Sequence, residues 1–319
     1  MSIPQSLQEY GKSIYDNAPS PGTAFLDNFS LEDKSFDISK SESYHLSIQL
    51  SNTGITYSVL DIERNKYLTI ENIGLNNPFG STFPEEEARS AFADRAILKS
   101  KYKSVSAAYI NNQATLVPTA IFDQGKAREY LRLNLEESKV TIDSARANGS
   151  HLEFAMDTLN ELKSVNLYYF PEEVKNTLRS AHKNVVIKHH SSILIQSALL
   201  RYKNQHKKIL LVHFHKDSFE ILVINENQLK LYNSFFYQSV EDFVYYILFA
   251  CEQLSLNPEQ IETVVFGQLN KHSDYYSMLY TYIRNITISK RPDNFEYSYQ
   301  FEDLPAHYYY NLFSQYLCV

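Results

Sequence analysis

The stretch that decides the fold reads Ile209-Leu-Leu-Val-His-Phe-His215, and it is followed by a tight turn at Lys216-Asp217. Two further runs come next, Ser218 to Ile224 and Gln228 to Phe235. Apolar, β-branched and aromatic residues fill these runs, and short polar segments separate them. This pattern predicts three antiparallel strands joined by tight turns, which is a β-meander.

The first half of the chain carries a similar pattern. Its parts are Tyr44-His-Leu-Ser-Ile-Gln-Leu50, a turn at Ser51-Asn-Thr-Gly54, and two runs, Ile55 to Leu60 and Lys66 to Glu71. Placing Gln49 over His213 gives an offset of 164 (213 − 49), and the run from Ile55 then falls on Phe219 to Ile224. The sequence therefore predicts two related halves.

Alternating strand and helix patterns follow each meander, and they predict parallel crossover connections beside the antiparallel strands. In the first half we expect helices at 82–98, 122–134, 171–182 and 191–201, and strands at 104–110, 114–117 (pairing back on 104–110), 139–143, 151–156, 165–170 and 185–188. In the second half we expect helices at 240–254, 273–284 and 304–317, and strands at 261–266 and 286–289.

The length of 319 residues exceeds the usual size of one hydrophobic core, so two domains are expected. We predict an N-terminal extension packed on the first domain at 1–40, a first domain at 41–203, and a second domain at 204–319 that the last helix closes. The fold class is α/β.

Composition excludes several kinds of partner. A formal net charge of −7 gives no general attraction to nucleic acid or anionic lipid. The longest apolar run, 243–251, is too short to span a bilayer, and residues 1–10 lack the pattern of a signal peptide. Cys251 and Cys318 are too few for a disulfide framework or a cysteine metal site, so a reducing cytoplasm is expected.

With its meanders and crossovers in place, the chain resembles the actin-like ATPase superfamily over residues 44–290. The resemblance is nearest to its pilus- and secretion-assembly branch and to an uncharacterised Bacteroidetes family. It implies two ribonuclease H-like domains, each a mixed sheet of a three-strand antiparallel meander and parallel crossovers with flanking helices. In that superfamily the two domains hold Mg-ATP between them.

The nucleotide motifs of that superfamily are degenerate here. Its first phosphate loop, Asp-x-Gly-x-Thr, is represented by Gln49-Leu-Ser-Asn-Thr53, in which only Thr53 matches. Its second loop, Asp-x-Gly-Gly-Gly-Thr, is represented by His213-Phe-His-Lys-Asp-Ser218. One glycine of the adenosine-side pair survives, Gly267. Because the metal-holding carboxylates and the phosphate-facing glycines are both replaced, the resemblance implies that ATP and magnesium are disfavoured as cofactors.

The candidate cleft residues are therefore those at the replaced or surviving motif positions: Gln49, Thr53, His213, His215, Lys216 and Gly267. His213 and His215 are two apart on a strand and point to one face, a spacing that zinc sites use. Only His189 and His190 suggest themselves as further ligands, so we predict no metal. An anion held by His215 and Lys216 is the stronger of these two alternatives.

These observations favour a non-catalytic actin-like protein that acts as a cytoplasmic interaction or assembly module with an unknown protein partner. Two alternatives stay open. One is an ATP-dependent enzyme, either an ATPase or a small-molecule kinase, whose metal is held by Asp61, Asp217 or Glu220. The other is an anion or metabolite sensor that uses the turn at His215 and Lys216.

Overall fold

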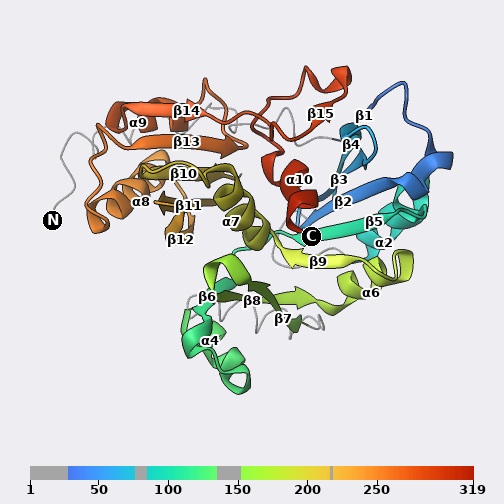
Figure 1. Ribbon diagram of the computed structural model, residues 1–319, viewed down its shortest axis with the longest axis horizontal. Helices are drawn as coiled ribbons and strands as arrows, with labels where there is room; N and C mark the ends of the chain where they lie inside the picture. Colours follow the sequence, from blue (N-terminus) through green and yellow to red (C-terminus); the bar gives the residue numbers. More distant parts are fainter. Residues whose placement is uncertain (1–27, 76–84, 135–151, 216–217) are drawn as a thin grey trace. The chain divides into compact units, whose positions relative to one another are not determined.

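The computed structural model describes residues 28–75, 85–134, 152–215 and 218–319 (Figure 1). The chain divides into two compact units. The larger unit contains the described residues up to Gln205, together with Asn227–Leu229 and Lys290–Val319. The smaller unit contains the described residues of His206–Glu226 and Lys230–Ser289.

The main sheet of the larger unit has the order β1-β4-β3-β2-β5-β9, and β15 pairs with β4. The strands are β1 Phe29–Glu32, β2 Tyr44–Ser51, β3 Gly54–Asp61, β4 Lys66–Gly74, β5 Ser104–Tyr109, β9 Val186–His189 and β15 Glu296–Tyr297. Strands β2, β3 and β4 form the predicted antiparallel meander, and β5 and β9 extend it by parallel pairing.

The sheet of the smaller unit repeats this plan, with the order β12-β11-β10-β13-β14. Its strands are β10 Ile209–Phe214, β11 Ser218–Asn225, β12 Gln228–Phe236, β13 Glu262–Gly267 and β14 Asn285–Ile288. The pairing of β10 with β11 is antiparallel, whereas β13 runs parallel to both β10 and β14.

The two meanders also share their register. Gln49 lies opposite Thr56 in the pair β2–β3, and His213 lies opposite Glu220 in the pair β10–β11. Both residues of the second pair are 164 positions beyond those of the first, since 213 − 49 and 220 − 56 are equal. The offset read from the sequence therefore aligns the hairpins residue by residue.

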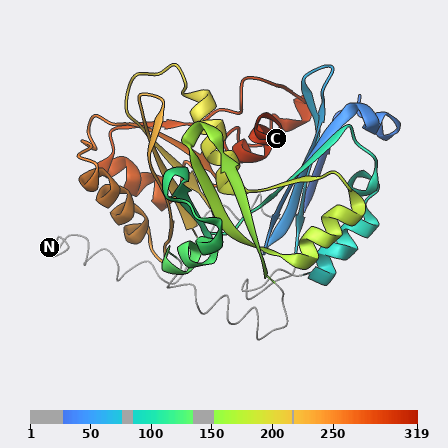
Figure 2. The same cartoon turned by 60° about the horizontal axis from the view of Figure 1, so that its bottom comes forward.

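Strand alternation gives each sheet one apolar face covered by helices. In the larger unit, Leu46, Ile48 and Leu50 of β2 pack in one core with residues of α2 (Glu85–Asp94) and α6 (Glu172–Ala181). These two helices lie side by side along the sheet (Figure 2). In the smaller unit, Leu210, Val212 and Phe214 pack with α8 (Val240–Gln253) and α9 (Asp274–Tyr282).

The other face of the larger sheet carries buried polar residues, and the end of the chain covers it. His45 and Ser47 are fully buried there. The Nε2 atom of Gln315 donates to the carbonyl of Ile48 at 3.2 Å and to Oγ of Ser106 at 2.8 Å. The hydroxyl of Tyr67 donates to the carbonyl of Phe313 at 2.7 Å.

These contacts correct the prediction that 204–319 forms one domain, because Lys290–Val319 belongs to the larger unit. The predicted helix at 304–317 is also too long. The structure has a short helix α10 (Tyr310–Ser314) followed by a 3₁₀ segment, Gln315–Cys318. Their spacing is typical of one long helix, but aromatic packing on the sheet determines their conformation. The rings of Phe313 and Tyr67, for example, have centroids 4.8 Å apart.

A separate sheet of three strands, with the order β6-β8-β7, is the second correction. We expected 114–117 to pair back on 104–110, but β6 (Ala114–Pro118) pairs antiparallel with β8 (Ser164–Pro171). β7 (Leu152–Leu159) pairs with the other edge of β8. Helix α4 (Ala127–Asn134) packs on this sheet, beginning later than the predicted residue 122 because 3₁₀ turns precede it. The strand predicted at 165–170 is β8, and every residue of β8 is buried.

The passage after β8 follows the predicted order of strand and helix. β9 lies at the edge of the main sheet, with Val186 42% exposed. Helix α7 (His190–Arg201) is capped by the side chain of His189, which accepts from the N–H of Ser191. The predicted strand at 139–143 and the start of the helix at 82 lie outside the described residues.

Candidate functional site

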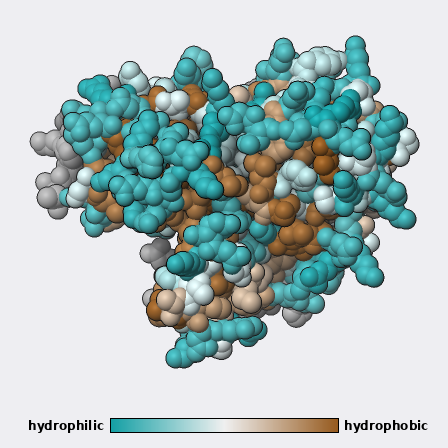
Figure 3. All heavy atoms as spheres, in the orientation of Figure 1, coloured by the Kyte–Doolittle hydropathy of each residue, from teal (hydrophilic) through white to brown (hydrophobic). Residues whose placement is uncertain are grey.

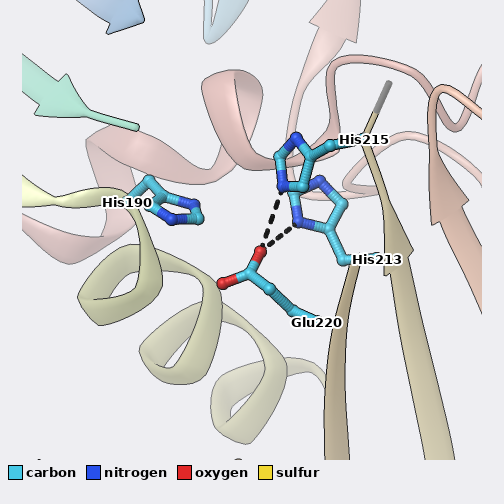
Figure 4. Close-up of side chains that lie close together, drawn as sticks. All are labelled: His190, His213, His215 and Glu220. Atoms are coloured by element: carbon cyan, nitrogen blue, oxygen red, sulfur yellow. Dashed lines mark hydrogen bonds and ion pairs between the residues drawn. The ribbon is translucent and has the colours of Figure 1, made fainter. Parts of the chain in front are cut away.

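The second phosphate-loop position is occupied by a cluster of side chains on the hairpin β10–β11. Nδ1–H of His213 donates to Oε2 of Glu220 at 2.8 Å. Nε2–H of His215 donates to the same oxygen at 3.2 Å. Figure 4 shows both imidazole rings directed at this single carboxylate oxygen. Two imidazole donors thus share one acceptor beside the turn that the sequence comparison aligned with the second phosphate loop.

Hairpin geometry explains how these residues meet. Because His213 and Glu220 are opposite each other across β10 and β11, their side chains share one face of the sheet. The N–H of His215 donates to the carbonyl of Ser218 at 2.8 Å, which continues the hairpin beyond the end of β10. Glu220 is 0% exposed and His213 is 4% exposed.

Neighbouring aromatic residues fix the orientation of the cluster. The hydroxyl of Tyr232 on β12 donates to Oε1 of Glu220 at 2.6 Å. The ring of Phe266 stacks on His213, with centroids 4.9 Å apart and an interplanar angle of 20°. The hydroxyl of Tyr237 donates to the carbonyl of His215 at 2.8 Å. Both carboxylate oxygens of Glu220 therefore have hydrogen-bond donors.

Gly267 contributes space to the packing of this hairpin. Its φ is +88°, and a Cβ atom there would lie 2.2 Å from the carbonyl oxygen of Phe214 and 2.8 Å from Cδ2 of His213. Glycine is needed because β13 approaches the backbone of β10 closely at this point. Among the predicted site residues, the structure thus brings together His213, His215 and Gly267. Lys216, like Asp217, lies outside the described residues.

The first turn, Ser51 to Gly54, is satisfied by its own side chain. The hydroxyl oxygen of Ser51 accepts from the N–H of Gly54 at 3.1 Å and from the N–H of Thr53 at 3.3 Å. Thr53 also contacts Ser51 through its hydroxyl at 3.1 Å. Backbone N–H groups in such a turn are the groups that bind phosphate in a nucleotide site. Here Ser51 occupies them.

Gln49 stands at the position of the first metal-holding carboxylate. Its side chain is 8% exposed, and its Nε2 atom makes no hydrogen bond within the described residues. An amide cannot supply the negative charge that a carboxylate gives a magnesium-bound water. Asp61, one alternative metal ligand, instead accepts from Nε of Arg64 at 2.6 Å and caps the turn between β3 and β4.

A buried polar network in the larger unit was missed at the sequence level. Oδ2 of Asp157 on β7 accepts from Oγ of Ser192 at 2.6 Å and from the N–H of His189 at 2.8 Å, while Oδ1 accepts from the hydroxyl of Tyr168 at 3.0 Å. Burial raises the pKa of Asp157, although these donors oppose the effect. The network fixes the start of α7. An aspartate directly after the predicted strand 151–156 was the available signal.

His189 and His190, the further ligands considered from the sequence, also have roles in the larger unit. Nε2 of His189 lies 2.9 Å from Oδ1 of Asn111, and Nε2 of His190 lies 2.9 Å from the carbonyl oxygen of the same asparagine. These histidines therefore hold the segment that follows β5.

Fold and hairpins together define the class of protein as one with an actin-like ATPase fold. The chain belongs to the family described as "Protein of unknown function (DUF3822)", whose model matches residues 33–286. Among curated proteins none matches this chain.

Two solved structures support the fold. A Bacteroides thetaiotaomicron protein "with actin-like ATPase fold and unknown function" matches with a TM-score of 0.69 and 21% identity, over 80% of this chain and 93% of that one. The PilM–PilN type IV pilus biogenesis complex matches with a TM-score of 0.50 and 12% identity, over 86% and 97%. The resemblance and the fold class predicted from the sequence are thereby confirmed.

Within the described part of the chain, no helix is both long and apolar enough to cross a membrane.

Proposed function

We propose that this chain is an actin-like protein without ATP turnover, and that it acts as an interaction or assembly module for another protein. The observation that carries the proposal is the content of the second turn, where His213, His215 and Glu220 bond one another. A triphosphate would have to displace a buried carboxylate that is hydrogen-bonded on both oxygens, and its phosphates would be repelled by the negative charge of that carboxylate.

The first turn supports the same conclusion independently. Ser51 accepts from the N–H groups of Thr53 and Gly54, and Gln49 carries no charge. Binding a phosphate there would require these hydrogen bonds to break and would gain no metal ligand in return. In this proposal, phosphate and metal binding is therefore lost in both halves of the duplicated fold.

Exposed aromatic side chains on the smaller unit favour protein binding. Tyr245 and Phe249 are one turn apart on α8, are 58% and 43% exposed, and stack with centroids 6.2 Å apart. Phe236 is 66% exposed. Hydrophilic residues cover most of the smaller unit's face drawn in Figure 3. Aromatic residues are enriched where protein interfaces form. The solved structure of PilM with PilN is an example of an actin-like fold in an assembly.

Calorimetry with Mg-ATP and a phosphate-release assay test the loss of catalysis. We expect neither micromolar binding nor turnover above the buffer rate. Micromolar affinity together with measurable phosphate release would overturn the proposal and favour the ATP-dependent enzyme instead.

Binding to a partner protein, the second part of the proposal, is tested by a separate experiment. Crosslinking in the source cells, followed by purification, should recover a defined partner in constant ratio with the wild-type chain, and less of it with the double variant Tyr245→Ser, Phe249→Ser. As a control, Leu133→Ser alters an exposed residue (72%) on α4 and should recover the partner normally. If all three proteins recover the same amount of partner, the aromatic residues of α8 do not bind it.

The sensor alternative is tested by the double variant His215→Ala, Lys216→Ala. Phosphate should raise the melting temperature of the wild type more than that of the variant if the turn binds anions. Glu220 beside His215 argues against this, because its carboxylate repels anions.

A further inference from the structure

Three side chains of the smaller unit converge on one point from two paired strands. His213, His215 and Glu220 each offer one ligand atom, and these ligand atoms lie within 4.8 Å of one another. Oε2 of Glu220 is 2.8 Å from Nδ1 of His213 and 3.2 Å from Nε2 of His215 (Figure 4). Each of the three atoms is one that binds metal ions in proteins.

The separations suit a small divalent ion. A tetrahedral zinc with ligand bonds of about 2.0 Å places its ligand atoms about 3.3 Å apart. The observed distances of 2.8 Å and 3.2 Å fall just short of this value. Side-chain movements of a few tenths of an ångström would make room for an ion, and the ion would replace the two protons that the imidazoles now donate to Glu220.

The donor set indicates the kind of metal. Two imidazole nitrogens and one carboxylate oxygen suit zinc and neighbouring transition metals, whereas calcium and magnesium prefer oxygen ligands. From the sequence, the two histidines suggested a zinc site, whereas Glu220 was considered only as the metal ligand of an ATP-dependent enzyme. Glu220 is the third member, and the register of the hairpin places it opposite His213.

The surroundings resemble the supporting shell of a metal site. Tyr232 holds Oε1 of Glu220 at 2.6 Å, which leaves Oε2 directed at the histidines. Phe266 stacks on His213 and fixes the plane of its ring. Such outer contacts orient metal ligands and strengthen binding. The side chain of His215 is 18% exposed and gives an ion access from solvent.

We propose that His213, His215 and Glu220 form a binding site for zinc or a similar divalent transition metal. Three ligands come from this unit, and a tetrahedral ion needs one ligand beyond these three. The site stands on these contacts alone and does not depend on the proposed interaction function.

Zinc titration of the chelator-treated full chain tests the proposal, by calorimetry and by competition with a zinc-sensitive dye. We expect one zinc per wild-type chain. Glu220→Gln and His215→Ala should each weaken binding by more than about 100-fold, and Tyr232→Phe by about tenfold, as for ligands and their outer contacts. Cobalt should give visible absorption bands typical of four-coordinate nitrogen and oxygen ligation.

His272→Ala is the matched control, because it removes an exposed histidine of the same unit and should bind one zinc with wild-type affinity. Circular dichroism and the metal-free melting temperature report whether each variant folds. Should His215→Ala not fold, Glu220→Gln and the cobalt spectrum of the wild type decide. The proposal is overturned if the folded wild type takes up no stoichiometric zinc, or if folded Glu220→Gln binds zinc as tightly as His272→Ala.

Discussion

His213 lies directly opposite Glu220 across the hairpin β10–β11, with Nδ1 of the imidazole 2.8 Å from the carboxylate. The equivalent pair in the first half, Gln49 and Thr56, occupies the same register but carries neither charge nor an imidazole. Thr56 instead donates to Asn72 at 2.7 Å. The two halves have therefore kept one backbone plan and filled it with different chemistry.

Replacing Glu220 by alanine should destabilise the protein by about 3 kcal/mol, because the substitution takes the acceptor from the buried imidazole of His213 and from two partly buried donors, His215 and Tyr232. Urea unfolding measures the change. Glu252→Ala is the control, since it alters an exposed glutamate of α8 and should stay within about 0.5 kcal/mol of wild type. Equal effects of the two substitutions would show that the buried cluster contributes nothing to stability.

Gly267→Ala should cost about 3 kcal/mol. The residue has a φ of +88°, and the added Cβ would lie 2.2 Å from a backbone oxygen that cannot move freely. Gly125→Ala provides the comparison, because its Cβ would meet only a side-chain oxygen of Asp123, at 3.3 Å. Thermal unfolding of both variants checks this. A melting temperature for Gly267→Ala as high as that of Gly125→Ala would contradict the close approach of the strands.

His45 should make stability fall at acid pH. It lies fully buried between Ser104 and Ser106, and burial lowers its pKa from 6.5 to about 3. The unfolded chain therefore binds a proton below pH 6.5 that the folded chain does not, and stability is lost by about 1.4 kcal/mol per pH unit as pH falls toward 3.

Urea unfolding of the wild type and of His45→Gln between pH 7.5 and about 4 isolates this contribution, because other groups titrate in both proteins. The difference in unfolding free energy should be constant above pH 7 and should move in favour of the variant below pH 6. Parallel curves over the whole range would show that His45 is not held neutral.

Phe313→Ala should destabilise the larger unit by about 3–5 kcal/mol. The ring is 1% exposed and packs against Tyr67 at 4.8 Å and Tyr297 at 5.1 Å. Leu133→Ala, which changes a 72% exposed residue, is expected to be nearly neutral. Chemical denaturation of both proteins gives the comparison. A small effect at Phe313 would mean that the end of the chain contributes little to the packing of this unit.

Most strands and helices could be predicted from the sequence, because strand alternation and helix spacing are written in neighbouring residues. Both meanders, the offset of 164 and the helices around Val240 and Asp274 follow from such local patterns. The pairing of Ala114–Pro118 could not be predicted, because two strands close in sequence resemble a hairpin whichever sheet they join.

Some residues of the candidate site could likewise be predicted from the sequence, and others could not. His213 and His215 stand out from the sequence through their spacing, and the missing phosphate-loop carboxylates can be read directly from it. Glu220 was considered only as an alternative magnesium ligand, although hairpin register places it opposite His213. Tyr232, on the next strand of the same meander, was not identified from the sequence. Phe266 could not be identified, since its position depends on the pairing of β10 with β13, two strands distant in the chain.

The sequence by itself determined a duplicated α/β plan and the residue types in the two turns that we compared with phosphate loops, because each can be read at short spacing. Only the tertiary structure decided that Lys290–Val319 joins the larger unit, and that two histidines and a glutamate share one point. Those outcomes depend on which surfaces can bury one another and which polar groups then need partners, and such contacts form between residues that no local pattern connects.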